Sequence, residues 1–108
     1  MKYALLIYSS PDVLSRHEDS TFAEYQSING SPGILAGVRL QPPGSATTVR
    51  VDDGQALLTD GPFVAAKEYL AGLYVFEANN LDAATAMAER IPVARLGGAI
   101  EVRPVADE

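Results

Sequence analysis

The chain has 108 residues, a size typical of one domain, and 47% of them are hydrophobic. Its 14 acidic and 8 basic residues give a net charge of −6, and the scattered Lys and Arg form no basic run, which argues against direct nucleic-acid binding. The absence of cysteine excludes disulfides, thiolate metal sites and cysteine nucleophiles, and no segment approaches the ~18 apolar residues of a membrane span. We therefore expect a single cytoplasmic domain over residues 1–108, without contact to membranes.

The first part of the chain predicts a strand, a loop and a helix. Residues 3–8 form an unbroken apolar run that ends at a Ser-Ser-Pro-Asp turn signal, which is typical of a strand buried on both faces. Residues 11–19 are polar and charged and predict a loop. Ser20 or Thr21 then predicts the N-cap of a helix, which stops or kinks at Pro32 because proline excludes the helical hydrogen bond.

Local signals are stronger in the rest of the chain. Asp52-Asp53-Gly54 separates two extended segments and predicts a β-hairpin, because Asp-Gly suits the positive φ values of a tight turn. Residues 72–78 alternate and predict a strand. Asn79-Asn80 predicts the cap of a helix over residues 81–91, which Pro92 ends, and a strand over residues 98–104 follows.

This order predicts an α+β fold of the ferredoxin-like type, an antiparallel sheet with two helices on one face. The strands are apolar on both faces, while two helices cover one face only. The second face, which we assign to Leu6, Tyr8, Tyr74 and Phe76 or to their neighbours of opposite parity, needs another sheet as its cover. We therefore expect a homodimer.

Four stretches of the chain together form a recognisable pattern. They are Met1-Lys2-Tyr3-Ala4-Leu5-Leu6-Ile7-Tyr8, Ala46-Thr47-Thr48-Val49-Arg50, the signature from Asp60-Gly61-Pro62-Phe63 to Gly72, and Ile91-Pro92-Val93-Ala94 with Glu101-Val102-Arg103-Pro104-Val105. In this order they resemble the DGPF branch of the YCII-like family. The resemblance implies a ferredoxin-like fold that dimerises sheet to sheet, called a dimeric α/β barrel. It also implies a link to alternative sigma factors, and hence a transcription-linked protein partner.

The chain departs from the family pattern at positions that carry chemistry. The branch has an acid and a hydroxyl between its Phe and its Lys-Glu, where this chain has Val64-Ala65-Ala66. The wider family is credited with a His–Asp acid–base dyad, and the corresponding places are held here by Phe22 and Ile91, which cannot transfer a proton. The resemblance therefore does not carry acid–base catalysis over to this chain.

Asp60 is the first candidate for a site residue. A carboxylate at a strand end beside a Gly-Pro turn can act as a catalytic base or bind a ligand hydroxyl, and the simpler explanation is an Asx-type turn. Arg50 and Tyr8 are candidate ligand-binding residues, a fixed cation and a phenolic donor, and Lys67 adds charge beside them. The simpler explanation for Arg50 and Arg103 is an ion pair with Asp60 or Glu101.

His17 is the only histidine, and its charged surroundings favour a solvated surface position over a site role. The tyrosines at 8, 25, 69 and 74 either line a pocket or pack in the core. No residue spacing indicates a metal site or a cofactor.

Three functions remain open. The first is a ligand-binding or regulatory protein that takes a small organic molecule. The second is a cofactor-free enzyme of lyase or isomerase type, with a cleft at the Asp60 turn. The third is a structural dimer without a ligand. The missing dyad favours the binding protein over the enzyme.

Overall fold

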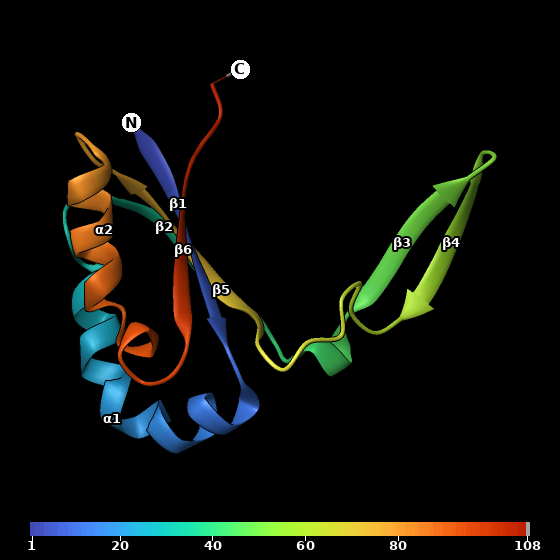
Figure 1. Ribbon diagram of the computed structural model, residues 1–108, viewed down its shortest axis with the longest axis horizontal. Helices are drawn as coiled ribbons and strands as arrows, with labels where there is room; N and C mark the ends of the chain where they lie inside the picture. The colour runs from blue at the N-terminus through green and yellow to red at the C-terminus, as the bar shows by residue number, and fades with distance from the viewer. Residues whose placement is uncertain (108) are drawn as a thin grey trace.

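The computed structural model describes residues 1–107, with Glu18 described by its backbone alone. Two α-helices cover one face of a four-stranded antiparallel sheet, and a two-stranded hairpin projects from its lower end (Figure 1). The elements in chain order are β1 (Lys2–Ser9), α1 (Pro11–Asn29), β2 (Ile34–Arg39), the 3-10 turn η1 (Pro43–Ser45), β3 (Thr47–Asp52), β4 (Gln55–Asp60), β5 (Tyr69–Glu77), α2 (Leu81–Arg90), the 3-10 turn η2 (Pro92–Ala94) and β6 (Ala99–Pro104).

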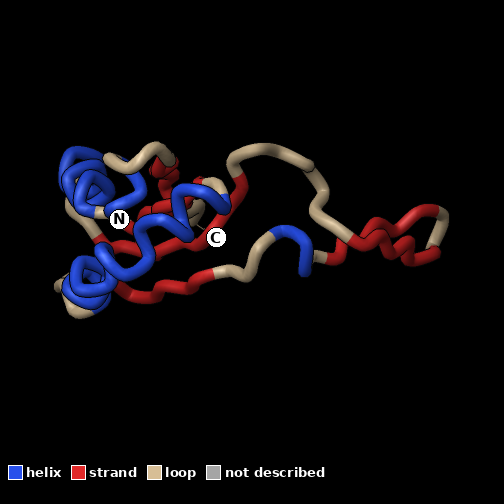
Figure 2. Tube along the Cα trace, turned by 90° about the horizontal axis from the view of Figure 1, so that it is seen from below, coloured by secondary structure: helices blue, strands red, loops and turns tan. Residues whose placement is uncertain are grey.

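The strand order is β2-β5-β1-β6, and each neighbouring pair is antiparallel. Leaving the hairpin aside, the order along the chain is strand, helix, strand, strand, helix, strand. This arrangement is consistent with the predicted ferredoxin-like fold. The hairpin β3–β4 is inserted between β2 and β5 as a separate two-stranded sheet, and Figure 2 shows that it stands clear of α1 and α2.

Alternation along β1 divides its side chains between the two faces of the sheet. Tyr3, Leu5 and Ile7 are buried and pack against the helices, whereas Leu6 is only half-buried on the other face. Leu5 lies opposite Tyr74 in β5, and Leu6 lies opposite Leu73. Directly opposite residues share a face, so the prediction that placed Tyr74 with Leu6 on the second face was wrong.

On the second face of the sheet, β1, β2 and β5 carry small and aliphatic side chains without a helix to cover them, and β6 adds the charged Glu101 and Arg103 at the edge. We call this surface the open face. It is made of Ala4, Leu6, Ala36, Val38, Leu73 and Val75, according to the register of β1, β2 and β5.

The predicted loop over residues 11–19 was also wrong, because α1 already begins at Pro11. The Oγ of Ser10 accepts a hydrogen bond from the Val13 backbone N–H at 3.3 Å, and proline is favourable at the first helical position. An ion pair of 2.9 Å between Asp12 and Arg16 lies on the outer side of the first turns. The charged residues in this segment thus form the solvated face of a helix.

The local signals in the second half of the chain are confirmed. The hairpin turns at Asp53 and Gly54, whose φ values are 48° and 78°. Asn80 caps α2 by accepting a hydrogen bond from the Ala83 N–H at 2.9 Å, and Pro92 begins the 3-10 turn that follows. Within residues 1–107 no helix is long and apolar enough to cross a membrane.

Candidate functional site

A cavity of about 380 Å³ lies between α1 and the β2–β5 side of the sheet. Its apolar walls come from β1, α1 and the turn after α2, and its polar groups come from α1, β2 and β5. The apolar side chains are those of Ile7, Val13, Leu14, Phe22, Ala71, Val93 and Leu96, and the polar side chains are those of His17, Thr21, Tyr25, Gln26, Asn29, Arg39 and Tyr74. Mostly apolar lining with a few convergent polar groups is typical of a small-molecule site.

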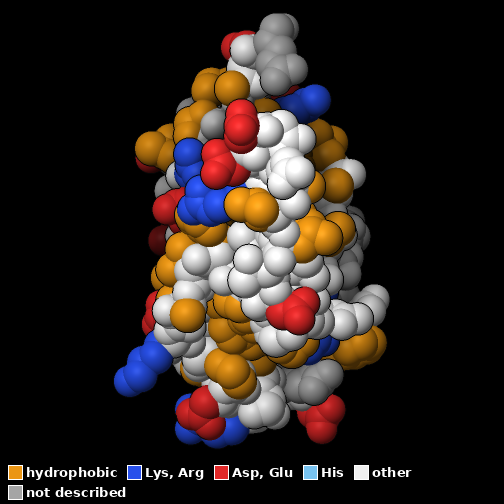
Figure 3. Space-filling model, turned by 90° about the vertical axis from the view of Figure 1, so that its right-hand side faces the viewer, with side chains coloured by type: hydrophobic (Ala, Val, Ile, Leu, Met, Phe, Trp, Pro, Cys, Tyr) orange, Lys and Arg blue, Asp and Glu red, His pale blue; other side chains and the backbone are white. Residues whose placement is uncertain are grey.

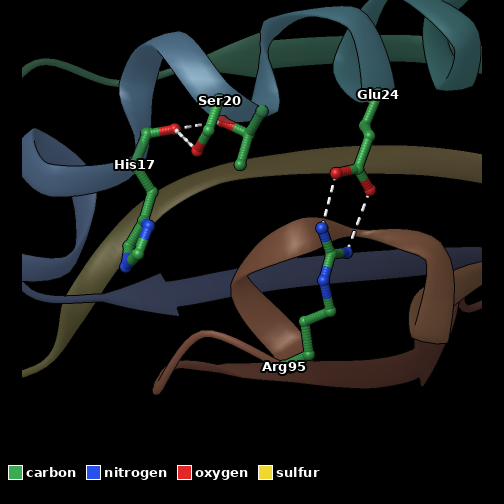
Figure 4. A network of polar contacts seen from close by, with 5 residues as sticks. His17, Ser20, Glu24 and Arg95 are labelled. Carbon is green, nitrogen blue, oxygen red and sulfur yellow. Dashed lines mark hydrogen bonds and ion pairs between the residues drawn. The ribbon is translucent and has the colours of Figure 1, made fainter.

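Helix α1 presents His17, Thr21 and Tyr25 to this cavity. They are spaced four residues apart and therefore lie in one row along the helix. The backbone carbonyl of His17 accepts hydrogen bonds from the hydroxyls of Thr21 at 2.7 Å and Ser20 at 3.1 Å, and its imidazole points toward the sheet (Figure 4).

Two tyrosines supply phenolic groups at the sheet side. The hydroxyl of Tyr74 donates a hydrogen bond of 3.0 Å to Oδ1 of Asn29. Burial raises the pKa of Tyr25, the neighbouring Tyr74 raises it further, and Arg39 lowers it. Burial also raises the pKa of Tyr74. Both phenols are therefore protonated at neutral pH and remain hydrogen-bond donors.

Two glycines allow the strands to approach here. A Cβ added to Gly37 would lie 2.6 Å from two ring carbons of Tyr74, and a Cβ added to Gly72 would lie 2.6 Å from the carbonyl oxygen of Val38. Any side chain at Gly37 must therefore displace the Tyr74 ring from its place in the cavity wall.

An ion pair joins α1 to the segment after α2 near the same cavity. Both terminal nitrogens of Arg95 donate to the carboxylate of Glu24, the longer contact being 2.9 Å (Figure 4). The hydrogen bond with Arg95 is the main cause that lowers the pKa of Glu24. The pair connects α1 to the segment that contributes Val93 and Leu96 to the cavity.

The residues predicted as a site lie elsewhere. Asp60 and Arg50 are exposed on the hairpin, and Lys67 is exposed in the loop that follows. Asp60 lies opposite Thr47, and Arg50 lies opposite Leu57, so the two side chains occupy opposite faces of the hairpin.

The contacts of Arg50 and Asp60 differ from the predicted ones, whereas Arg103 makes a predicted ion pair. The guanidinium carbon of Arg50 is 4.8 Å from the centroid of the Phe63 ring, a cation–π contact. Arg103 makes the ion pair with Glu101, at 3.9 Å. The carboxylate of Asp60 makes no hydrogen bond or ion pair with the residues that the structure describes, so the Asx-type turn is not seen.

Tyr8 is half-buried in a separate, more open groove at the base of the hairpin. The groove is lined mainly by apolar groups, among them Leu40, Pro42, Phe63 and Tyr69. Asp60, Arg50 and Lys67 are not part of its lining. Within one chain the four predicted residues are therefore not gathered in a single pocket.

Sequence reasoning missed the cavity because it took residues 11–19 for a loop. The Ser10-Pro11 pair, a capping residue followed by proline, was the available signal for an earlier helix start. With the helix begun at Pro11, the four-residue spacing of His17, Thr21 and Tyr25 identifies its inner row.

The positions of the family dyad give no acid–base pair in this cavity. Phe22 contributes to its wall, and Ile91 is fully buried in the core at the end of α2. The described lining contains no carboxylate side chain. Among the described side chains, those of residues 1–17 and 19–107, no group of three or more His, Asp or Glu is placed to hold a metal ion.

Similarity to known proteins extends over the whole chain. The model of the YCII-related domain family matches residues 1–108. An uncharacterised protein of Rhizobium meliloti (strain 1021) is 34% identical over 115 aligned residues, which cover 98% of this chain and 93% of that protein. The chain therefore belongs to the YCII-related domain family.

Proposed function

We propose that this chain is a small-molecule-binding protein that takes an organic anion with an aromatic or aliphatic body in the cavity between α1 and the sheet. The observation that carries the proposal is the convergence of Arg39, His17 and Tyr25 on a mainly apolar cavity of about 380 Å³. That volume lies within the range of small-ligand pockets, roughly 300–1,000 Å³.

The lining residues divide into two groups that suit the two parts of such a ligand. Arg39 supplies a positive charge, and it lines the same cavity as Tyr25. The protonated Tyr25 phenol and the His17 imidazole offer hydrogen-bond donors to an anionic head group. Ile7, Phe22 and Leu96 offer apolar walls to the body of the ligand.

Binding is favoured over the alternative of a cofactor-free lyase or isomerase. Proton-transfer catalysis needs a positioned acid or base at the reacting atom, and the described cavity lining offers His17 and two tyrosines of raised pKa but no carboxylate side chain. The predicted enzyme site at Asp60 lies on an exposed strand end of the hairpin. Turnover of a bound acid that is abolished by Asp60→Asn would favour the enzyme.

Two further parts of the proposal rest on the family. Membership of the DGPF branch, with its link to alternative sigma factors, gives the binding protein a regulatory role and a transcription-linked partner. A homodimer formed through the open face agrees with the half-buried Leu6 and Leu73 and with the exposed Val38. A structural dimer without a ligand is the remaining alternative, and a cytoplasmic location stays a prediction from the sequence.

Ligand binding is tested by thermal shift and then by titration calorimetry, with benzoate and larger aromatic carboxylates as probes. Each acid is paired with its neutral amide, which has the same shape without the charge. We expect the acids to raise the melting temperature and the amides to have little effect. Arg39→Gln should weaken binding about 10–100-fold, the range expected for one charge-assisted hydrogen bond.

The matched control is Asp60→Ala, which we expect to bind as the wild type does. Tyr25→Phe removes only the hydroxyl and should weaken binding less than Arg39→Gln. If an acid binds the wild type and Arg39→Gln but no longer binds Asp60→Ala, the site lies on the hairpin. The absence of any hit among acids of this size would favour the structural dimer.

A further inference from the structure

The hairpin formed by β3 and β4, residues 47–60, projects from the sheet as an arm. Its two strands pair only with each other within the described chain, and every residue in it except Thr48 is exposed. An isolated two-stranded hairpin is marginally stable in water, because it has no layer to pack against. The arm therefore needs a partner surface.

The arm is amphipathic. Thr47 lies opposite Asp60, Val49 opposite Leu58, and Val51 opposite Ala56, so these pairs share one face. Val51 and Leu58 are each 70% exposed there. We call the surface made of Val49, Val51, Ala56 and Leu58 the apolar arm face. The opposite face carries Thr48, Arg50, Asp52, Gln55, Leu57 and Thr59 and is mainly polar.

A single copy exposes more surface than a compact chain of its size. The accessible surface is 7395 Å². The scaling for folded monomers gives about 5,800 Å² for this mass, so the excess is about 1,600 Å². The radius of gyration of 15.6 Å also exceeds the roughly 13 Å expected for a compact chain of this length. A standard protein interface buries roughly 800 Å² per partner, so the excess is ample for a stable dimer.

The arm and the open face lie on the same side of the molecule. In Figure 1 the helices cover the left of the sheet, and the arm projects to the right, on the side of the open face. Figure 3, viewed from that side, shows hydrophobic side chains exposed between scattered charged ones. The arm and the open face are therefore both accessible to a partner that approaches from this side.

We propose that the apolar arm face and the open face together form the docking surface for a second copy of this chain. The arm of each copy packs against the other copy. Each copy carries both apolar surfaces. A two-fold axis between the copies would therefore bury the arm and the open face of each copy in one interface. The inference deepens the homodimer of the proposed function by adding the arm to its interface. It does not depend on the ligand.

The test compares two substitutions in β4 that change the charge equally. Leu58→Lys lies in the apolar arm face, and Gln55→Lys lies on the opposite face, beside Asp52. Both positions are exposed in a single copy, so a monomer would tolerate both. Sedimentation equilibrium of the wild type should give a dimer. Leu58→Lys should raise the dimer dissociation constant about 100-fold or more, because the buried leucine is lost from both copies, and Gln55→Lys should change it less than about threefold.

A second variant covers the case in which lysine disrupts the hairpin itself. Val51→Thr keeps the shape and the strand propensity of valine, and we expect it to raise the dissociation constant about tenfold. A monomeric wild type at micromolar concentration would overturn the proposal. So would a wild-type dimer that Leu58→Lys and Val51→Thr leave intact, and in that case the homodimer through the open face would stand without the arm. Benzoate binding in each variant reports separately on the cavity.

Discussion

The hydroxyl of Ser9 is fully buried and has no hydrogen-bond partner among the residues that the structure describes. An unmade buried hydrogen bond costs free energy, so Ser9→Ala should leave the free energy of unfolding unchanged or raise it by about 1 kcal/mol. The neighbouring Ser10→Ala is the matched control, because it removes the cap of α1 and should cost about 1 kcal/mol. Chemical denaturation of both variants measures the difference. A larger loss for Ser9→Ala than for Ser10→Ala would contradict the burial argument.

The Glu24–Arg95 pair predicts a dependence of stability on pH. Arg95 lowers the pKa of Glu24 in the folded state below its ordinary value of 4.5. The stabilisation from the pair is therefore fully present above pH 4.5, and it is lost as the pH falls through the lowered pKa. Arg95→Gln should be less stable than the wild type at pH 7, and this difference should shrink at acid pH. Urea denaturation at several pH values measures it. The effect should be small, because both side chains are about half exposed.

At the scale of the element, the base of the hairpin depends on Gly61, which directly follows β4. Its φ is 103°, its N–H donates to the Ala46 carbonyl at 2.7 Å, and its carbonyl accepts from the Thr48 hydroxyl at 2.8 Å. A β-branched residue is strained in this conformation. Gly61→Val should therefore cost about 1–3 kcal/mol, whereas Asp60→Asn should stay within about 0.5 kcal/mol.

Gly44→Val is the control for this prediction. Neither glycine has an atom within 4 Å of an added Cβ, but only Gly61 has a positive φ. Calorimetry should show a lower free energy of unfolding for Gly61→Val and little change for Gly44→Val. A greater loss for Asp60→Asn than for Gly61→Val would mean that the Asp60 carboxylate has a structural charge interaction.

For the whole molecule, dimerisation predicts that thermal stability depends on protein concentration. A partner that binds the folded state but not the unfolded state stabilises it by mass action. The melting temperature of the wild type should therefore rise as the concentration increases from micromolar to hundreds of micromolar. Leu58→Lys should show a weaker dependence over the same range. A wild type whose melting temperature does not depend on concentration, and whose mass by light scattering is that of one chain, would contradict the dimer.

Elements defined by neighbouring residues were predicted correctly. The hairpin follows from the positive φ values that Asp53 and Gly54 adopt, and α2 follows from the Asn80 cap and the proline after Ile91. These signals act over a few residues, so their physical effect does not depend on the rest of the chain. The start of α1 was missed because its charged residues, which form a solvated face, predict a loop, and because Ser10-Pro11 also fits a turn at the end of the first strand.

The sequence by itself determined the α+β class, the hairpin and α2, because capping, turn conformation and apolar periodicity are local properties. Only the tertiary structure decided which residues face each other. Asn29 and Tyr74 are 45 residues apart, and their contact depends on how α1 packs on β5. Likewise, Tyr74 faces the helices and Leu73 the open face because of the β1–β5 register, and a shift of one residue would exchange them. The cavity and the docking surface both depend on such contacts between distant segments, since neither is contained in one segment of the chain.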